Sequence, residues 1–241
     1  SIEELARKLV KENRRLATEA NKILKDIVKT NRDSIRKVRE ILKELVERLR
    51  DLIRKVRRDG DDDERKLEEI VRELEKRLEE IKRKLDKVVK ESEDLIKEIE
   101  DKIRELDKRS EDKLREIEER LKDSGRESVE KVLTELLKVH EDHLRELIKV
   151  LDELLRLNDE SVRKLKELVE ELLRVAEDVV RKIKVDEDLK RELERAKREL
   201  ERLLRELDEE HERMKKKVKD EIRRLKKESE EVKKEVKDTE D

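Results

Sequence analysis

The sequence predicts an all-α fold, a long, nearly straight, antiparallel up-down-up-down four-helix bundle. Three observations lead to this prediction. Of the 241 residues, 59% are Lys, Arg, Asp or Glu, against about 25% in ordinary domains. The apolar residues recur about every 3.6 positions, which is the period of an α-helix and argues against the disorder that such a charge content could indicate. Only three short segments interrupt this pattern.

The breaks divide the chain into predicted helices over residues 2–58, 62–123, 127–184 and 187–237. The first helix ends before Gly60, a residue type suited to the left-handed position after a helix. Asp61 and Glu64 form a capping-box pattern for the second helix. The second break contains Gly125, whereas the third has no Gly and offers Asp186 as the N-cap of the last helix.

We expect a single bundle over residues 1–241, built from hairpin 1 (1–123), hairpin 2 (127–241) and the connection 123–127. The segment 31–37 resembles the segment 158–164, so the hairpins look like two similar units related by a pseudo-twofold axis. Doubled apolar positions such as Ile27-Val28 and Leu172-Leu173 occur mainly in the first and third helices. A wider apolar stripe implies more burial, so these two helices should lie deeper.

The apolar stripe of the second predicted helix has a step of about 3.6 residues, as a straight helix requires. It is expected to contain Leu67, Val71, Leu74, Leu78, Ile81, Leu85, Val88, Ser92, Leu95, Ile99, Ile103, Leu106, Ser110, Leu114, Ile117 and Leu121. A strict heptad would instead give 3.5 and a left-handed supercoil.

Each predicted helix carries two polar residues on its apolar stripe, 18 residues or five turns apart. They are Asn13 and Asn31, Ser92 and Ser110, His140 and Asn158, and His211 and Ser229. In an antiparallel bundle, two residues of consecutive helices can lie at one height. The midpoint of their residue numbers must then fall in the turn between the two helices. The midpoints fall between Asp61 and Asp62, at Gly125, and between Lys184 and Val185. These positions are the three breaks.

The matched heights predict two buried polar layers. One contains Asn13, Ser110, His140 and Ser229. The other contains Asn31, Ser92, Asn158 and His211, with Ser34 and Ser161 one turn along. Candidates to join from the edge of the stripe are Thr18, Asn21, Thr30 and Thr134. Buried polar groups are costly unless they are paired, and a paired layer specifies register and partner. The alternative interpretation is scattered polar residues in contact with water.

The composition excludes most chemistry. Without Cys there is no disulfide, thiolate zinc site or Cys nucleophile. Without aromatic residues there is no base-stacking platform, and two Gly residues provide no phosphate loop. His140 and His143 could share a metal, but the Glu-x-x-His pattern of di-metal bundles is absent around them. We therefore expect no enzyme activity, no cofactor and no metal. Protonation of His140 and His211, the two histidines expected inside, should destabilise the fold modestly near pH 5.

These features together resemble de novo designed helical bundles, namely designed heterodimers of helical hairpins held by buried hydrogen-bond networks. The resemblance rests on the missing residue types, the Glu/Lys/Arg surfaces, the minimal loops and the layered Asn, Ser and His residues, and it covers the whole chain. It implies two hairpins joined in one chain through residues 123–126, specific pairing as the designed purpose, and no catalytic activity. The third turn departs from the usual pattern because it lacks Gly.

The alternative is a natural coiled-coil or spectrin-like rod that bridges protein partners, although such rods usually carry Gln and aromatic residues. A domain-swapped homodimer is the alternative to pairing of the hairpins within one chain. Acidic and basic residues are interleaved and the longest apolar runs are pairs, so we expect no nucleic-acid, membrane or small-molecule partner. The sequence predicts a soluble chain with no targeting signal, cytoplasmic on recombinant expression, and it leaves the natural location unknown.

Overall fold

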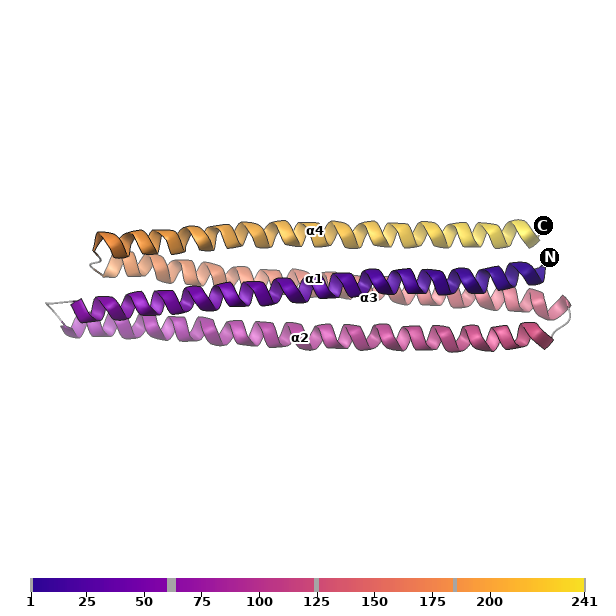
Figure 1. The fold of residues 1–241 in the computed structure, drawn as a ribbon, viewed down its shortest axis with the longest axis horizontal. Coiled ribbons are helices and arrows are strands. Elements are labelled where there is room, and N and C mark those ends of the chain that lie inside the picture. The colour runs from indigo at the N-terminus through magenta and orange to yellow at the C-terminus, as the bar shows by residue number, and fades with distance from the viewer. Residues whose placement is uncertain (1, 60–63, 124–125, 184–185, 241) are drawn as a thin grey trace. The chain divides into compact units, whose positions relative to one another are not determined.

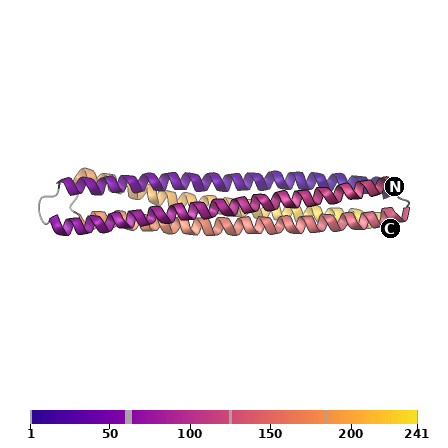
Figure 2. The same cartoon turned by 90° about the horizontal axis from the view of Figure 1, so that it is seen from below.

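The computed structural model of the chain describes residues 2–59, 64–123, 126–183 and 186–240 (Figure 1, Figure 2). The four helices are α1 (Ile2–Asp59), α2 (Glu64–Asp123), α3 (Arg126–Lys182) and α4 (Glu187–Glu240). The all-α four-helix prediction is confirmed, and the helix ends lie within three residues of the predicted ones. Gly60, Asp61 and Gly125, which the sequence placed in the turns, lie outside the described residues.

The chain divides into two compact units, each with a section of all four helices. The first unit comprises Ser1–Thr30, Leu95–Arg156 and Met214–Asp241. The second unit comprises Asn31–Asp94 and Leu157–Arg213. This division runs across the helices and differs from the hairpin division, which stays a prediction.

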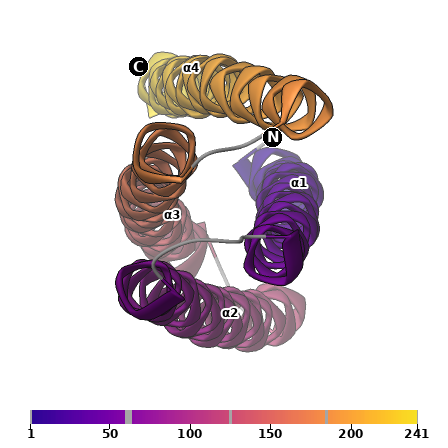
Figure 3. The ribbon, with the colours of Figure 1, turned by 90° about the vertical axis from the view of Figure 1, so that its left-hand side faces the viewer.

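Within the first unit, α1 and α3 are central and each contacts the three other helices (Figure 3). Arg14 of α1 pairs with Glu111 and Glu118 of α2. As residue numbers rise in α1 they fall along α2, so the two sections are antiparallel. The polar contacts of α1 with α3 run through Asn13 and His140.

The second unit shows the same neighbours around its helix sections. Three ion pairs illustrate them: Lys43 with Asp86 between α1 and α2, Arg77 with Asp178 between α2 and α3, and Arg48 with Glu199 between α1 and α4. The pair of Lys197 and Glu177 joins α4 to α3. The repeated arrangement follows from a stripe that keeps one period through each helix.

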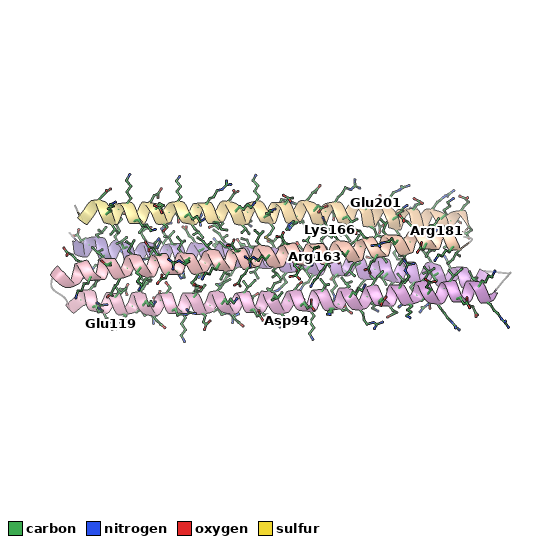
Figure 4. All side chains as sticks on the ribbon, turned by 180° about the vertical axis from the view of Figure 1, so that it is seen from behind. Asp94, Glu119, Arg163, Lys166, Arg181 and Glu201 are labelled. Carbon is green, nitrogen blue, oxygen red and sulfur yellow. The ribbon has the colours of Figure 1, made fainter. Side chains whose placement is uncertain are left out.

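The interior of each unit consists mainly of aliphatic side chains, because the sequence supplies no aromatic ones. One cluster in the first unit draws on all four helices and contains Ala6, Leu9, Val10, Leu114, Ile117, Leu121, Val132, Leu133, Leu136 and Val236. Full burial of one such Leu, Ile or Val side chain contributes about 1.5–3 kcal/mol. The charged residues occupy the outer faces, where Asp94, Glu119, Arg163 and Arg181 are exposed (Figure 4).

The prediction that Leu95 lies on the buried apolar stripe of α2 is wrong. Leu95 is 41% exposed, whereas its neighbour Ile96 is fully buried. Both 3-then-4 and 4-then-3 spacings between Ser92 and Ile99 satisfy a helical period, and the sequence offers an apolar residue for each. The packing of α2 uses Ile96 and leaves Leu95 on the outer edge of the stripe.

Candidate functional site: buried polar side chains

The structure buries eight of the ten polar residues singled out in the sequence. They are Asn13, Asn31, Ser92, Ser110, His140, Asn158, Ser161 and Ser229. Ser34 and His211 are half-buried. Each of the ten has at least one aliphatic residue one turn away on its own helix, for example Val38 for Ser34 and Leu207 for His211. Because the polar residues share the helical period of the apolar stripe, their side chains point inward together with the Leu, Ile and Val side chains.

In the first unit, Asn13 and His140 form a hydrogen bond across α1 and α3. The distance between Asn13 Oδ1 and His140 Nδ1 is 2.6 Å. In this orientation the Nδ1–H donates to the amide oxygen, which leaves Nε2 as a lone-pair acceptor. His140 Nε2 is buried and has no hydrogen-bond partner. Ser110 and Ser229 are buried in the same unit, but among the described residues neither hydroxyl is bonded to this pair.

His140 and His143 are held neutral by their surroundings. Burial is the main cause that lowers the pKa of His140, and His143 and Lys233 lower it further, while Glu141 opposes them. Burial also lowers the pKa of His143. His140 is buried, as predicted, whereas His143 and His211 are both half-buried, so the prediction that His211 is the second histidine inside stays a prediction.

In the second unit, two hydrogen bonds join the predicted layer residues. Ser92 Oγ lies 2.9 Å from Ser161 Oγ, which links α2 to α3. Asn158 Nδ2 lies 3.0 Å from His211 Nδ1, which links α3 to α4. The other ring nitrogen of His211, Nε2, lies 2.5 Å from Asp159 Oδ1.

The hydrogen bonds form pairs that each connect two helices. Asn31 is buried, and its Nδ2 has no partner. The grouping of the ten residues into two four-helix layers therefore stays a prediction. The arrangement can fix which residues of neighbouring helices face one another. A shift of one helix would break these hydrogen bonds, and an unpaired buried donor or acceptor costs about 1–3 kcal/mol.

The sequence pattern did not predict the polar contact between Asn21 and Asp107. Asn21 Nδ2 donates to Asp107 Oδ2 between α1 and α2. Burial raises the pKa of the Asp107 carboxyl, against the opposing effects of Asn21 and Lys25. Asn21 was recognised as a candidate at the edge of the stripe. Asp107 was not recognised as a candidate, because an acidic residue next to the buried Leu106 looks like another surface charge. The available signal was its position three residues before Ser110, which is about one helical turn.

The three threonines that were candidates to join the layers do not do so. The hydroxyls of Thr18, Thr30 and Thr134 donate to the carbonyl oxygens of Arg14, Asp26 and Glu130 in their own helices. This is the usual local bond of a helical Thr, and it satisfies the hydroxyl without a neighbouring helix.

No group of three or more His, Cys, Asp or Glu side chains within the described ranges is arranged to hold a metal ion. In the same part of the chain, none of the helices combines the length and the apolar character that crossing a membrane requires. No protein-family model matches the chain, and comparisons with curated proteins and with solved structures also found no match.

Proposed function

We propose that this chain is a de novo designed structural scaffold in which two helical hairpins pair specifically through buried polar groups, without a natural biochemical activity. The observation that carries the proposal is that two buried hydrogen bonds run from hairpin 1 to hairpin 2. The Asn13–His140 and Ser92–Ser161 contacts each join a residue of hairpin 1 to a residue of hairpin 2. Buried polar contacts in the interface between two hairpins determine which hairpins pair with each other.

The two hairpins differ at these contacts, which disfavours pairing of like with like. Under the pseudo-twofold relation of the sequence, two copies of hairpin 1 would bring two Asn13 side chains together. Two copies of hairpin 2 would bring two His140 rings together, and the Asn–His match would be lost. Specificity is a difference between such affinities, and a buried polar mismatch is one of its common sources.

Surface ion pairs also cross between the hairpins. Lys102 pairs with Glu153 and Lys8 pairs with Glu235, each at 2.8 Å. Exposed ion pairs contribute about 0–1 kcal/mol each, so they add little to stability. Their matched signs support one alignment of the hairpins, whereas the buried Asn13–His140 pair carries the larger penalty for a mismatch.

The proposal includes no partner of another chemical class. The interleaved charges and the absence of aromatic side chains in the sequence support a scaffold without nucleic-acid, membrane or small-molecule ligands. On this proposal the hairpins pair within the chain, and a domain-swapped homodimer is the competing arrangement.

The test is to insert a protease site into the connection 123–127, cleave the folded chain, unfold it in denaturant and let the fragments refold together. Native mass spectrometry then counts the three pairings, which have different masses. We expect the pair of hairpin 1 with hairpin 2 to exceed each like pair by at least about tenfold, a preference of about 1.4 kcal/mol. A statistical mixture of the three pairings would contradict the proposal.

A cleaved variant with Asn13→Ala and Ser92→Ala tests whether the polar contacts carry the preference. The fragments should still pair, because the aliphatic interior is unchanged, but the preference should fall towards the statistical ratio. The matched control replaces Thr18 and Thr30 with Ala, since these hydroxyls bond only within α1. The control should keep the full preference.

A further inference from the structure

A half-buried polar pair joins α1 to α2 in the first unit. Asn21 Nδ2 donates a hydrogen bond to Asp107 Oδ2. The two remaining oxygens of the pair, Asn21 Oδ1 and Asp107 Oδ1, are shielded from solvent, and neither has a hydrogen-bond partner among the described residues. Both atoms are acceptors when the carboxyl is ionised. The pair therefore contains two buried oxygens that lack a donor, which is costly.

A single proton supplies the missing donor. A primary amide and a protonated carboxyl match each other, because each offers a donor and an acceptor side by side. The amide N–H of Asn21 donates to one carboxyl oxygen, and the O–H of a protonated Asp107 can donate to the amide oxygen. If the amide were turned over, its oxygen would face Asp107 Oδ2, and that contact would also need a proton between two oxygens. Both orientations of the Asn21 amide therefore favour a protonated Asp107.

The surroundings of Asp107 favour the neutral form of its carboxyl. Burial is the main cause that raises the pKa of this carboxyl, because the charged form loses its hydration. The hydrogen bond from Asn21 and the positive charge of Lys25 on α1 act in the opposite direction and are the weaker causes. The electrostatic environment thus agrees with the two oxygens that lack a donor.

The other charged groups around Asp107 have partners of their own or lie beside a different part of α2. One turn away along α2, Arg104 pairs with Glu100 and Glu111 pairs with Arg14 of α1. The titratable groups that α3 brings to α2 at this height are Asp142, His143 and Glu146, which line a groove with Leu106 and Ser110. Within the described part of the chain, none of these groups forms a hydrogen bond or an ion pair with Asp107.

We propose that Asp107 takes up a proton at a pH at which exposed carboxylates are still ionised, and that its O–H then donates to the Asn21 amide oxygen. The proton comes from the solvent and converts the carboxylate into a neutral carboxyl. The closed acid–amide pair has two hydrogen bonds instead of one, so mild acidification strengthens the contact between α1 and α2. Both residues belong to hairpin 1, and the inference therefore goes beyond the proposed pairing of two hairpins and does not depend on it.

The first test compares Asp107→Asn with Asp107→Leu in the full chain by chemical unfolding at pH 7. An amide at position 107 offers a donor and an acceptor, as the protonated carboxyl does, whereas Leu leaves Asn21 unpaired. We expect an unfolding equilibrium constant about 5- to 30-fold lower for Asp107→Asn than for Asp107→Leu. In an Asn21→Leu background the order should reverse. The same order in both backgrounds would mean that the two residues do not act as a pair, and the proposal is then overturned.

The second test measures the pH dependence of stability with Asp107→Asn as the reference, because this variant keeps all histidines and has no carboxyl at position 107. A carboxyl that binds its proton more tightly in the folded state makes the parent more stable as the pH falls. The ratio of the unfolding equilibrium constants, parent over Asp107→Asn, should therefore fall at least about twofold between pH 7 and pH 4.5. A constant ratio would overturn the proposal.

Asp112→Asn is the matched control, because Asp112 is an exposed acid of the same helix. The ratio of parent over Asp112→Asn should not show this fall. An equal fall for both substitutions would mean that the effect belongs to the acids of α2 in general, which contradicts a specific site at Asp107.

The third test uses the unaltered protein and separates the acid–amide pair from a carboxyl that is only buried. A crystal structure at pH 4.5 should place a carboxyl oxygen of Asp107 within about 2.5–3.0 Å of the Asn21 amide oxygen, a distance at which two oxygens share a proton. In ¹³C-labelled protein, the Asp107 carboxyl carbon should titrate with a midpoint above that of Asp112. A water molecule or a cation between the two oxygens, or equal midpoints, would overturn the proposal.

Discussion

At the residue scale, His140 and His143 make the stability of the first unit depend on pH. Both have a pKa lowered by burial from the ordinary value of 6.5. Below pH 6.5 the unfolded chain therefore binds more protons than the folded chain, and the free energy of unfolding falls as the pH falls. We expect a lower Tm at pH 5.5 than at pH 7.5 in thermal unfolding followed by circular dichroism.

The double variant His140→Asn and His143→Asn should flatten this dependence. The raised pKa of Asp107 has the opposite sign, because the folded state then holds its proton more tightly and gains stability on acidification. Asp107 is present in both proteins, so it cancels in the comparison. A double variant whose Tm falls as steeply as that of the parent would refute the assignment to these histidines.

A second prediction at this scale compares two buried asparagines. Asn13→Ala leaves the ring of His140, which is only 5% exposed, without its hydrogen bond. The cost should be about 1–3 kcal/mol. Asn158→Ala should cost about 1 kcal/mol less, because the His211 side chain is 17% exposed and keeps Asp159 as its partner. Urea unfolding of both variants measures the difference, and equal costs would argue against the role given to burial.

At the element scale, α2 shows what a period predicts and where it becomes ambiguous. The average step of 3.6 residues places the helix and most of its buried face correctly, since those depend on many residues at once. The choice between Leu95 and Ile96 depends on one 3-or-4 step, and only contacts with the neighbouring helices decide it. The hydrogen-bond partners of His211 and Asn21 have the same limit, because they depend on side-chain rotamers.

Substitutions at these two positions of α2 should therefore differ strongly. Ile96→Ala removes a fully buried side chain and should cost about 2–5 kcal/mol. Leu95→Ala changes an exposed position and should stay within about 0.5 kcal/mol of the parent. Chemical unfolding of the two single variants provides the measurement. The reverse order would mean that the stripe continues through Leu95.

The start of α4 is the one helix end where a predicted cap falls on described residues. Asp186 Oδ1 accepts a hydrogen bond from Leu189 N–H at 2.8 Å, so the predicted N-cap is confirmed. Asp186→Ala should destabilise the protein by about 0.5–2 kcal/mol in urea unfolding, because that N–H loses its acceptor. Asp186→Ser restores an acceptor and should recover most of the loss. If Ser gives no recovery, the cap is not the cause.

At the scale of the whole molecule, the question is whether each chain closes on itself. The connection between α2 and α3 spans only residues 124 and 125, and the ion pair of Arg120 with Glu135 lies close to it on both helices. A short connection gives the intramolecular partner an effective concentration of about millimolar. At micromolar protein, pairing within the chain should therefore prevail over exchange between chains.

Light scattering coupled to size exclusion should give a mass of 29.3 kDa, that of one chain, at micromolar concentration. The mass should not change on dilution, because pairing within one chain does not depend on concentration. A rigid helical insertion in the connection 123–127 is the contrasting variant, since it separates the hairpins and should shift the population to twice that mass. If the parent itself has twice the mass of one chain, the hairpins pair between chains and the closed arrangement is wrong.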